Sequence, residues 1–399
     1  MALRLYVWGP AFNLPSIDAE SIAAIAYLSQ TTSQADYKLI QSSPSAVPTH
    51  QLPSLYDPST STWSSGYLQI LRYLSLHPPP SFHDPSASSP STTANLHFLL
   101  SHCPPLIALS LYVSSTNWSS STRPAYSRIL PLPLPWTEPS SVRAAMTRRA
   151  EHLGMSSLDT DAEEEKRQAE EKASNAAGWI SVPPALRRTP RDAMVPEFAR
   201  RIKLEQLARD VLDVVKDMEL RENSGLRCLA FGFLSLMMVD EVPRKWLAET
   251  VRGVEEYKGL VGFAEGFRRE VFEGQEVDLS RDEAAESALG LTVRFLEAVV
   301  CEVPWVGGEW RRRAAVRRKR KMLEGRGVKV REEGEEDGLV LAGAGVAALA
   351  VGVGIFFYRR LPPFGASVQV WNAPSLTFGS LGAAGAMLGG VFGVVDGAY

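Results

Sequence analysis

With 399 residues, of which 45% are hydrophobic and 22% charged, the chain has room for two or three globular domains. A formal net charge of -3 gives no reason to expect a nucleic-acid-binding protein. Three cysteines, Cys103, Cys228 and Cys301, stand far apart in apolar runs, without the CxxC or Cys/His spacing of a zinc site. We expect buried, reduced thiols, which suit a reducing compartment.

The first 76 residues alternate strand-like runs with amphipathic helices. Strands are expected at Leu3–Trp8, Tyr37–Ile40 and Gln51–Tyr56, and helices at Ala19–Ser29 and Tyr67–Leu74. Ser16 or Asp18 is expected to cap the first helix. The order β-α-β-β-α is typical of a thioredoxin-like domain, to which we assign residues 1–76. Because the chain opens directly into a strand without a signal peptide or Arg-rich presequence, we expect targeting information elsewhere.

Beyond a Pro/Ser-rich linker at 77–94, helical periodicity replaces the strand pattern. Residues 95–305 are predicted to form an all-helical domain, with helices at about Leu96–Val113, Pro139–Leu153, Glu197–Glu222, Cys228–Val239, Pro243–Tyr257, Leu260–Phe272 and Arg281–Val300. Pro104 and Pro105 are expected to kink or divide the first of these helices. The charged stretch 156–178 is predicted to be an insertion, either a solvated helix or a disordered segment.

The C-terminal part begins with a linker at 306–337 that is basic and then acidic. Its Arg311–Arg331 segment holds eleven Lys/Arg, which are candidates for contact with anionic lipid headgroups. Residues 338–358 follow, 21 residues without a charge. As a helix of roughly 31 Å they are long enough to cross a hydrocarbon core of about 30 Å. The sequence therefore predicts a C-terminal transmembrane anchor.

A second, weakly hydrophobic stretch covers residues 375–395. Gly385, Gly389 and Gly393 recur at a spacing of four and lie on one face of a helix, as in close helix packing within lipid. The stretch is either a second membrane-embedded helix, which makes the anchor a hairpin, or a disordered Gly/Ala tail.

A thioredoxin-like half followed by a helical half is the layout of glutathione transferases, so glutathione chemistry is tested first. These enzymes need a Ser, Tyr or Cys after strand one, but here Tyr6 is expected in the core and Ser16 at a helix cap. The acid and hydroxyl that hold the γ-glutamyl group are replaced by Gly66 and Tyr67. Pro53 stands where the fold keeps a cis-proline.

Other site chemistry is absent from the sequence pattern. The six histidines are scattered, and His97 and His102, five residues apart, miss the helical ligand spacings. No Walker loop, GxSxG or HExxH motif occurs. We therefore assign no catalytic residue, no cofactor-binding residue and no metal ligand, and predict that the protein is not an enzyme.

Two segments carry a more specific pattern. The first, LYVWGPAFNLPSIDAESIAAIAYL (5–28), contains Trp8 and Gly9. The second, TNWSSSTRPAYSRILPLPLP (116–135), contains the motif residues Asn117, Trp118, Thr122, Arg123, Pro124, Tyr126, Leu130, Pro131, Pro133 and Leu134. Both resemble the metaxin family, with a weaker similarity at 229–251. One departure is Arg227, where the wider fold keeps a capping Asp, and Ser224 is the candidate replacement.

The resemblance implies a fungal-type metaxin-like subunit of the mitochondrial outer-membrane sorting and assembly machinery (the SAM complex). Such a subunit has a glutathione-transferase-like body facing the cytosol, a C-terminal anchor and no cofactor. Its implied partners are the β-barrel core subunit, a second metaxin-like subunit, β-barrel precursors and outer-membrane lipid, without nucleic acid. The implied role is non-enzymatic support of complex stability and of precursor insertion and release.

Two alternatives remain open for the function. One is a membrane-tethered glutathione transferase, and the other is a tail-anchored adaptor on another organelle. The Pro131–Pro139 loop with Trp136 also has two interpretations, a strip that contacts a partner or a packed interhelix loop.

Overall fold

The computed structural model describes residues 2–84, 89–153, 190–220, 223–272, 279–281 and 288–302, together with positions 312 and 316. Several predicted features lie outside the described residues: the charged insertion at 156–178, the spans at 338–358 and 375–395, and Gly385, Gly389 and Gly393. The anchor therefore stays a prediction.

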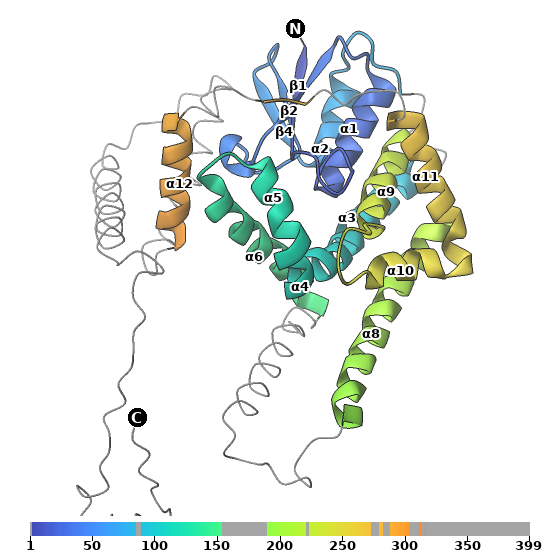
Figure 1. The fold of residues 1–399 in the computed structure, drawn as a ribbon. Coiled ribbons are helices and arrows are strands. Elements are labelled where there is room, and N and C mark those ends of the chain that lie inside the picture. Colours follow the sequence, from blue (N-terminus) through green and yellow to red (C-terminus); the bar gives the residue numbers. More distant parts are fainter. Residues whose placement is uncertain are drawn as a thin grey trace, which may run out of the picture. The chain divides into compact units, whose positions relative to one another are not determined.

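A mixed sheet with the strand order β4-β3-β1-β2-β5 forms the N-terminal half (Figure 1). Its strands are β1 (Leu3–Val7), β2 (Tyr37–Gln41), β3 (Ser54–Asp57), β4 (Thr62–Ser65) and β5 (Ser280–Arg281). β1 runs parallel to β2 and antiparallel to β3, so Leu5 stands opposite both Leu39 and Leu55. All three leucines are buried, and this ladder forms the centre of the sheet's core.

Two strands were not predicted. The TWSS sequence of β4 is short and polar, and it becomes a strand by pairing with β3. Trp63 on β4 stacks 4.7 Å from Tyr56 and 5.1 Å from Tyr6, between ring centroids. β5 pairs in parallel with β2, far away in the sequence, so the predicted helix start at Arg281 is wrong. Long-range pairing leaves no local periodicity to detect.

Helices α1 (Ala19–Thr31) and α2 (Tyr67–Leu76) lie beside the sheet (Figure 1). Asp18 caps α1, since its Oδ2 accepts the N–H of Ser21 at 2.9 Å. Ser16 is fully buried and its Oγ accepts the N–H of Asp18 at 3.3 Å, so it supports the cap residue. The Leu52–Pro53 peptide bond is cis, as the resemblance to the wider fold implies.

The helical half follows the predicted order with shifted ends. It comprises α3 (Pro90–Ile107), η2 (Ala108–Val113), α4 (Ser115–Asn117), η3 (Trp118–Thr122), α5 (Arg123–Ile129), η4 (Leu134–Trp136), α6 (Glu138–Ala150), η5 (Glu151–Leu153), α8 (Pro190–Asp217), α9 (Ser224–Met237), α10 (Trp246–Gly253), η7 (Glu255–Tyr257), α11 (Lys258–Phe272) and α12 (Ala288–Glu302). A further short turn, η1 (Pro44–Ala46), precedes β3. A mixed sheet followed by these helices is consistent with a glutathione-transferase-like layout.

The paired prolines do not end α3. Pro104 and Pro105 both lie within it, and hydrogen bonding changes to the π type only at Ala108, so the expected division at the prolines is wrong, while the alternative of a kink stays a prediction. The N–H of Ala108 bonds to both proline carbonyls. A π-helical segment adjusts the bonding register without breaking the helix.

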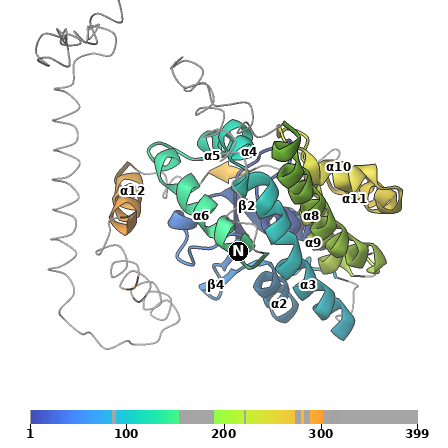
Figure 2. The same cartoon turned by 90° about the horizontal axis from the view of Figure 1, so that it is seen from below.

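Among the described residues, Pro90–Val113 is the one segment long and apolar enough to cross a membrane, judged by length and composition. Most of it is buried within the body, where α3 packs against α8 and α9 (Figure 2). This burial is the behaviour of a core helix.

The two halves meet where α9 packs along α1 (Figure 1). Gly232 permits the contact, because a Cβ at this position would lie 2.3 Å from the carbonyl oxygen of Ala19. The cap of α9 is Asn223, whose Oδ1 accepts the N–H of Leu226 at 2.9 Å. The expected cap Ser224 is therefore wrong, because it is the first helical residue. Arg227 instead lies over the Phe267 ring, 4.6 Å from its centroid.

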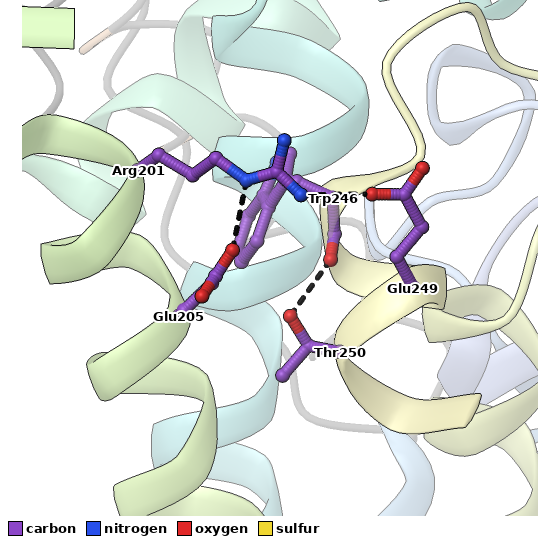
Figure 3. A network of polar contacts seen from close by, with 5 residues as sticks. All are labelled: Arg201, Glu205, Trp246, Glu249 and Thr250. Atoms are coloured by element: carbon purple, nitrogen blue, oxygen red, sulfur yellow. Dashed lines mark hydrogen bonds and ion pairs between the residues drawn. The ribbon is translucent and has the colours of Figure 1, made fainter. Parts of the chain in front are cut away.

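A polar network joins α8 to α10 at the surface (Figure 3). Arg201 Nε donates to Glu205 at 2.8 Å and Nη2 donates to Glu249 at 3.1 Å. On α10, Thr250 Oγ1 donates to the Trp246 carbonyl at 2.8 Å. Arg201 and Glu249 are both 58% exposed and Glu205 is half-buried at the surface, so the network adds little stability.

Cys103 and Cys228 are buried free thiols, as expected, whereas Cys301 is only half-buried. Burial raises the pKa of both buried thiols far above the ordinary thiol value. They therefore stay protonated and unreactive at neutral pH.

Candidate functional site

The second family-like segment folds into α4, η3 and α5, directly after the long helix formed by α3 and η2. Helix ends leave their last carbonyls without intrahelical donors. Here the last four carbonyls, from Ser110 to Val113, all receive side-chain donors from outside the helix.

Asn117 supplies the first of these donors and is fully buried. Its Nδ2 donates to the carbonyl of Ser110 at 2.8 Å and to that of Arg244 at 2.9 Å. Its Oδ1 accepts the N–H of Arg244 at 2.8 Å. The side-chain amide thus ties the end of η2 to the loop that precedes α10.

Thr122 and Arg143 serve the remaining three carbonyls. Thr122 Oγ1, fully buried, donates to the Leu111 carbonyl at 2.8 Å. Arg143 Nε donates to Tyr112 at 2.9 Å, and its Nη2 donates to Val113 at 3.4 Å. A cation at a helix C-terminus also interacts favourably with the helix dipole.

Aromatic rings from both family-like segments form one cluster next to this helix end. Trp8, at the end of β1, lies 5.1 Å from Tyr126 in an edge-to-face arrangement. Tyr126 shares a 2.8 Å hydroxyl hydrogen bond with Tyr112, and the Trp118 ring lies 6.4 Å away. Arg143 lies over Trp118, with 5.4 Å from Cζ to the ring centroid. The structure therefore brings Trp8, Trp118 and Tyr126 together across the two halves.

Gly9 and Pro124 complete the motif as backbone features. A Cβ on Gly9 would lie 2.7 Å from the Gln41 side chain and 2.8 Å from Cγ2 of Ile129, so the chain needs glycine here. Gln41 Nε2 in turn donates to the Ile129 carbonyl at 2.9 Å. Pro124 lies in the first turn of α5, and Arg123 is the exposed member of the motif. Most motif residues are thus positioned to hold the body together.

The place where glutathione transferases bind their ligand lies at the start of α2. Gly66 is the N-cap, with φ of 80° and no capping side chain, which suits glycine. The first helical N–H, that of Tyr67, donates to Oε2 of Glu20 at 3.1 Å. Tyr67 is buried and its hydroxyl donates to the Gly225 carbonyl at 2.8 Å. A carboxylate of the chain therefore sits at the helix N-terminus.

A cavity of about 500 Å³ opens beside Glu20, and Gln51, Gly66, Gln69 and Arg149 contribute to its lining. Burial raises the pKa of Glu20 to about 7, and the charge of Asp18 acts in the same direction. Neither Tyr6 nor Ser16, the candidate thiol-activating residues, lines this cavity. At the N-terminus of α2, the cavity is therefore lined by a carboxylate that belongs to the chain itself.

The histidines on α3 are placed apart from this cavity. His102 stacks on Phe98 with 4.3 Å between ring centroids, and it is exposed. No cluster of three or more potential metal ligands occurs among the described residues. A second candidate site lies on the surface of α5, η4 and α6.

A groove of about 530 Å³ runs along α5, η4 and α6. Trp118, Arg123, Trp136, Arg143 and Arg148 contribute to its lining. The Pro131–Pro139 loop beside the groove has features of both interpretations, a packed loop and a strip that contacts a partner. Leu134 and Pro135 are buried, whereas Leu132 and Trp136 are 70% and 68% exposed.

Residues 21–143 match the family model Tom37, described as outer mitochondrial membrane transport complex protein. This segment, 123 of the 399 residues, is similar to that metaxin-like family. The match includes Pro53, the motif from Asn117 to Tyr126 and the groove-lining Arg143. No curated protein matched the chain. The family description points to the outer mitochondrial membrane and to a transport complex.

Two residues of the described body, Glu20 and Arg143, could not be identified as site residues from the sequence. Glu20 has the pattern of an ordinary acid in the first turn of a helix, and its use at α2 depends on a contact 47 positions away. Arg143 lies in a polar helix, and no spacing connects it to the end of η2. Only the second family-like segment signalled that this neighbourhood matters.

Proposed function

We propose that the chain is a non-enzymatic subunit of the mitochondrial outer-membrane β-barrel sorting and assembly machinery. It supports the stability of that complex and the insertion and release of β-barrel precursors. Its partners are the β-barrel core subunit and a second metaxin-like subunit. The observation that carries the proposal is the family match over residues 21–143, which includes the whole Asn117–Tyr126 motif.

The proposed architecture is a glutathione-transferase-like body with a thioredoxin-like domain at 1–76 and a helical domain at 95–305. The body faces the cytosol, and residues 338–358 anchor it in the outer membrane. In support, Glu20 occupies the helix N-terminus that an enzyme of this fold offers to its ligand carboxylate. Such a fold serves as a surface for other subunits.

The decisive experiment is affinity purification of the tagged full-length protein from mitochondria in mild detergent. We expect a β-barrel assembly protein and a second metaxin-like protein to co-purify. Recovery of the chain as a lone monomer contradicts the proposal. A matched variant, Arg201→Ala, removes only the surface ion pairs to Glu205 and Glu249 and serves as the control for folding and expression.

The alternative of a tethered glutathione transferase draws support from the cavity beside Glu20. It predicts glutathione binding at millimolar concentration, measured by calorimetry on the full-length protein in detergent. We expect no binding, because the Glu20 carboxylate already accepts the N–H of Tyr67. The adaptor alternative predicts a location other than mitochondria, which imaging of the tagged full-length protein tests.

A further inference from the structure

An exposed apolar surface lies where the proline-rich loop meets α12. Leu132 and Trp136 of the loop are 70% and 68% exposed. The Trp136 and Phe295 rings lie edge to face with 6.2 Å between centroids, which joins the loop to α12. Together with Arg123 and Arg148, we call Leu132 and Trp136 the apolar–basic face.

The charge beside these apolar side chains is mainly positive. The groove next to Trp136 is lined by Arg123, Arg143 and Arg148, with Glu151 as the one acid among its described lining residues. Arg143 is held in place by the carbonyls of η2, whereas Arg123 and Arg148 are exposed. The groove therefore offers guanidinium groups to an anion.

This combination matches the chemistry of a membrane interface. Tryptophan favours the headgroup level, aliphatic side chains enter the acyl boundary, and arginines bind lipid phosphates. Leu132 lies outside the groove lining, and Trp136, which lines the groove together with the buried Trp118, is still 68% exposed. Large apolar side chains that remain exposed beside arginines favour a lipid surface over an acidic peptide held inside the groove.

We propose that the apolar–basic face docks on the anionic lipid surface of the membrane to which the chain is tethered. Arg123 and Arg148 bind phosphate headgroups, and Leu132 and Trp136 enter the acyl boundary. The proposal rests on the proposed function for the C-terminal anchor. Residues 303–337, which lead to the predicted span, begin at the end of α12, the helix that contacts Trp136.

The test uses the full-length protein reconstituted in phosphatidylcholine vesicles with and without phosphatidylserine. An environment-sensitive fluorophore is attached at Leu132→Cys in a Cys301→Ser background, since Cys103 and Cys228 are buried. The matched control is Leu76→Cys at the end of α2, because Leu76 is 65% exposed and lies outside the apolar–basic face.

In anionic vesicles we expect the probe at position 132 to shift its emission to the blue and to be quenched by lipids with acyl-chain quenchers. The probe at position 76 keeps the emission of an aqueous environment. Arg123→Gln and Arg148→Gln each lower the ratio of docked to undocked protein by about fivefold, the equivalent of about 1 kcal/mol per charge near an anionic surface.

Emission typical of an aqueous environment at position 132, or the same emission and quenching at positions 132 and 76, overturns the proposal. Protection of position 132 only when other mitochondrial proteins are present also overturns it, and indicates a protein partner instead. Carbonate extraction of the same vesicles tests the anchor separately. A resistant protein with an aqueous probe contradicts docking alone, whereas an extractable protein with a lipid-exposed probe contradicts the anchor alone.

Discussion

Two helix ends, the start of α2 and the end of η2, receive side chains from elsewhere in the chain and use opposite chemistry. At the start of α2, the N–H of Tyr67 donates to Glu20, a carboxylate whose pKa burial raises to about 7. At the end of η2, Asn117, Thr122 and Arg143 donate to four successive carbonyls. The first end depends on a group that titrates near neutrality, and the second uses groups that do not.

The difference indicates which of the two helix ends depends on pH and which does not. The amide, hydroxyl and guanidinium at η2 keep their hydrogen bonds at any physiological pH, and all four carbonyls are served together. The single carboxylate at α2 is partly open to a cavity. We therefore expect the η2 end to be the rigid joint between the halves and the α2 end to respond to pH.

The largest expected effect comes from Asn117→Ala. It leaves the N–H and carbonyl of Arg244 and the carbonyl of Ser110 without their buried partner, so the free energy of unfolding falls by about 3 kcal/mol. Chemical denaturation of the full-length protein in detergent measures it. Ser121→Ala, which removes one exposed hydrogen bond to the Glu241 carbonyl, is the matched control. Similar losses in the two variants contradict the comparison.

The α2 end is tested through pH. Because the folded pKa of Glu20, about 7, exceeds its ordinary value of 4.5, the folded state binds more protons than the unfolded state between these values. This contribution is complete below about pH 4.5 and is lost as the pH rises through 7, so stability falls by about 2–3 kcal/mol from pH 5 to 8.

Glu20→Gln sharpens this test, because the amide oxygen still accepts the N–H of Tyr67 but does not titrate. Denaturation at several pH values is expected to give a flatter profile than the wild-type protein. A residual slope of the same sign remains from Asp18, whose pKa burial also raises. Parallel profiles for the two proteins show that Glu20 does not carry the dependence.

Thr122→Val tests one hydrogen bond at the end of η2, because valine has nearly the same side-chain shape as threonine but lacks the hydroxyl. It leaves the Leu111 carbonyl without its side-chain donor and is expected to cost about 1–2 kcal/mol. Thr122→Ser keeps the hydroxyl and is the control, expected to lie closer to the wild-type protein. Thermal unfolding distinguishes the two, and a more stable Val variant speaks against the capping role.

The smallest effect is expected at the surface network between α8 and α10 (Figure 3). Arg201→Ala removes exposed ion pairs to Glu205 and Glu249 and is expected to change stability by less than about 1 kcal/mol. Its remaining effect weakens in high salt, since exposed charges are screened. A loss as large as that of Asn117→Ala contradicts the view that buried helix ends dominate.

Local sequence patterns predicted the elements that are stabilised by contacts between residues close together in the chain. Asp18 caps α1 through Ser21, three residues away, and the predicted helical runs that correspond to α3, α6 and α8 to α11 follow the spacing of their apolar residues. The family resemblance pointed to the segment around Asn117 before any contact was known. The anchor at 338–358 remains a prediction of this kind, because it follows from composition and length alone.

The sequence by itself thus predicted three of the five strands of the described sheet, most of the long helices, a resemblance to the metaxin family and the neighbourhood of the motif. Only the tertiary structure decided that β5 pairs with β2, that Asn117 binds Arg244 and that Glu20 occupies the start of α2. Each of these is a hydrogen bond between segments far apart in the chain. Such partners become neighbours only when apolar burial has packed the halves together, so no local spacing encodes them.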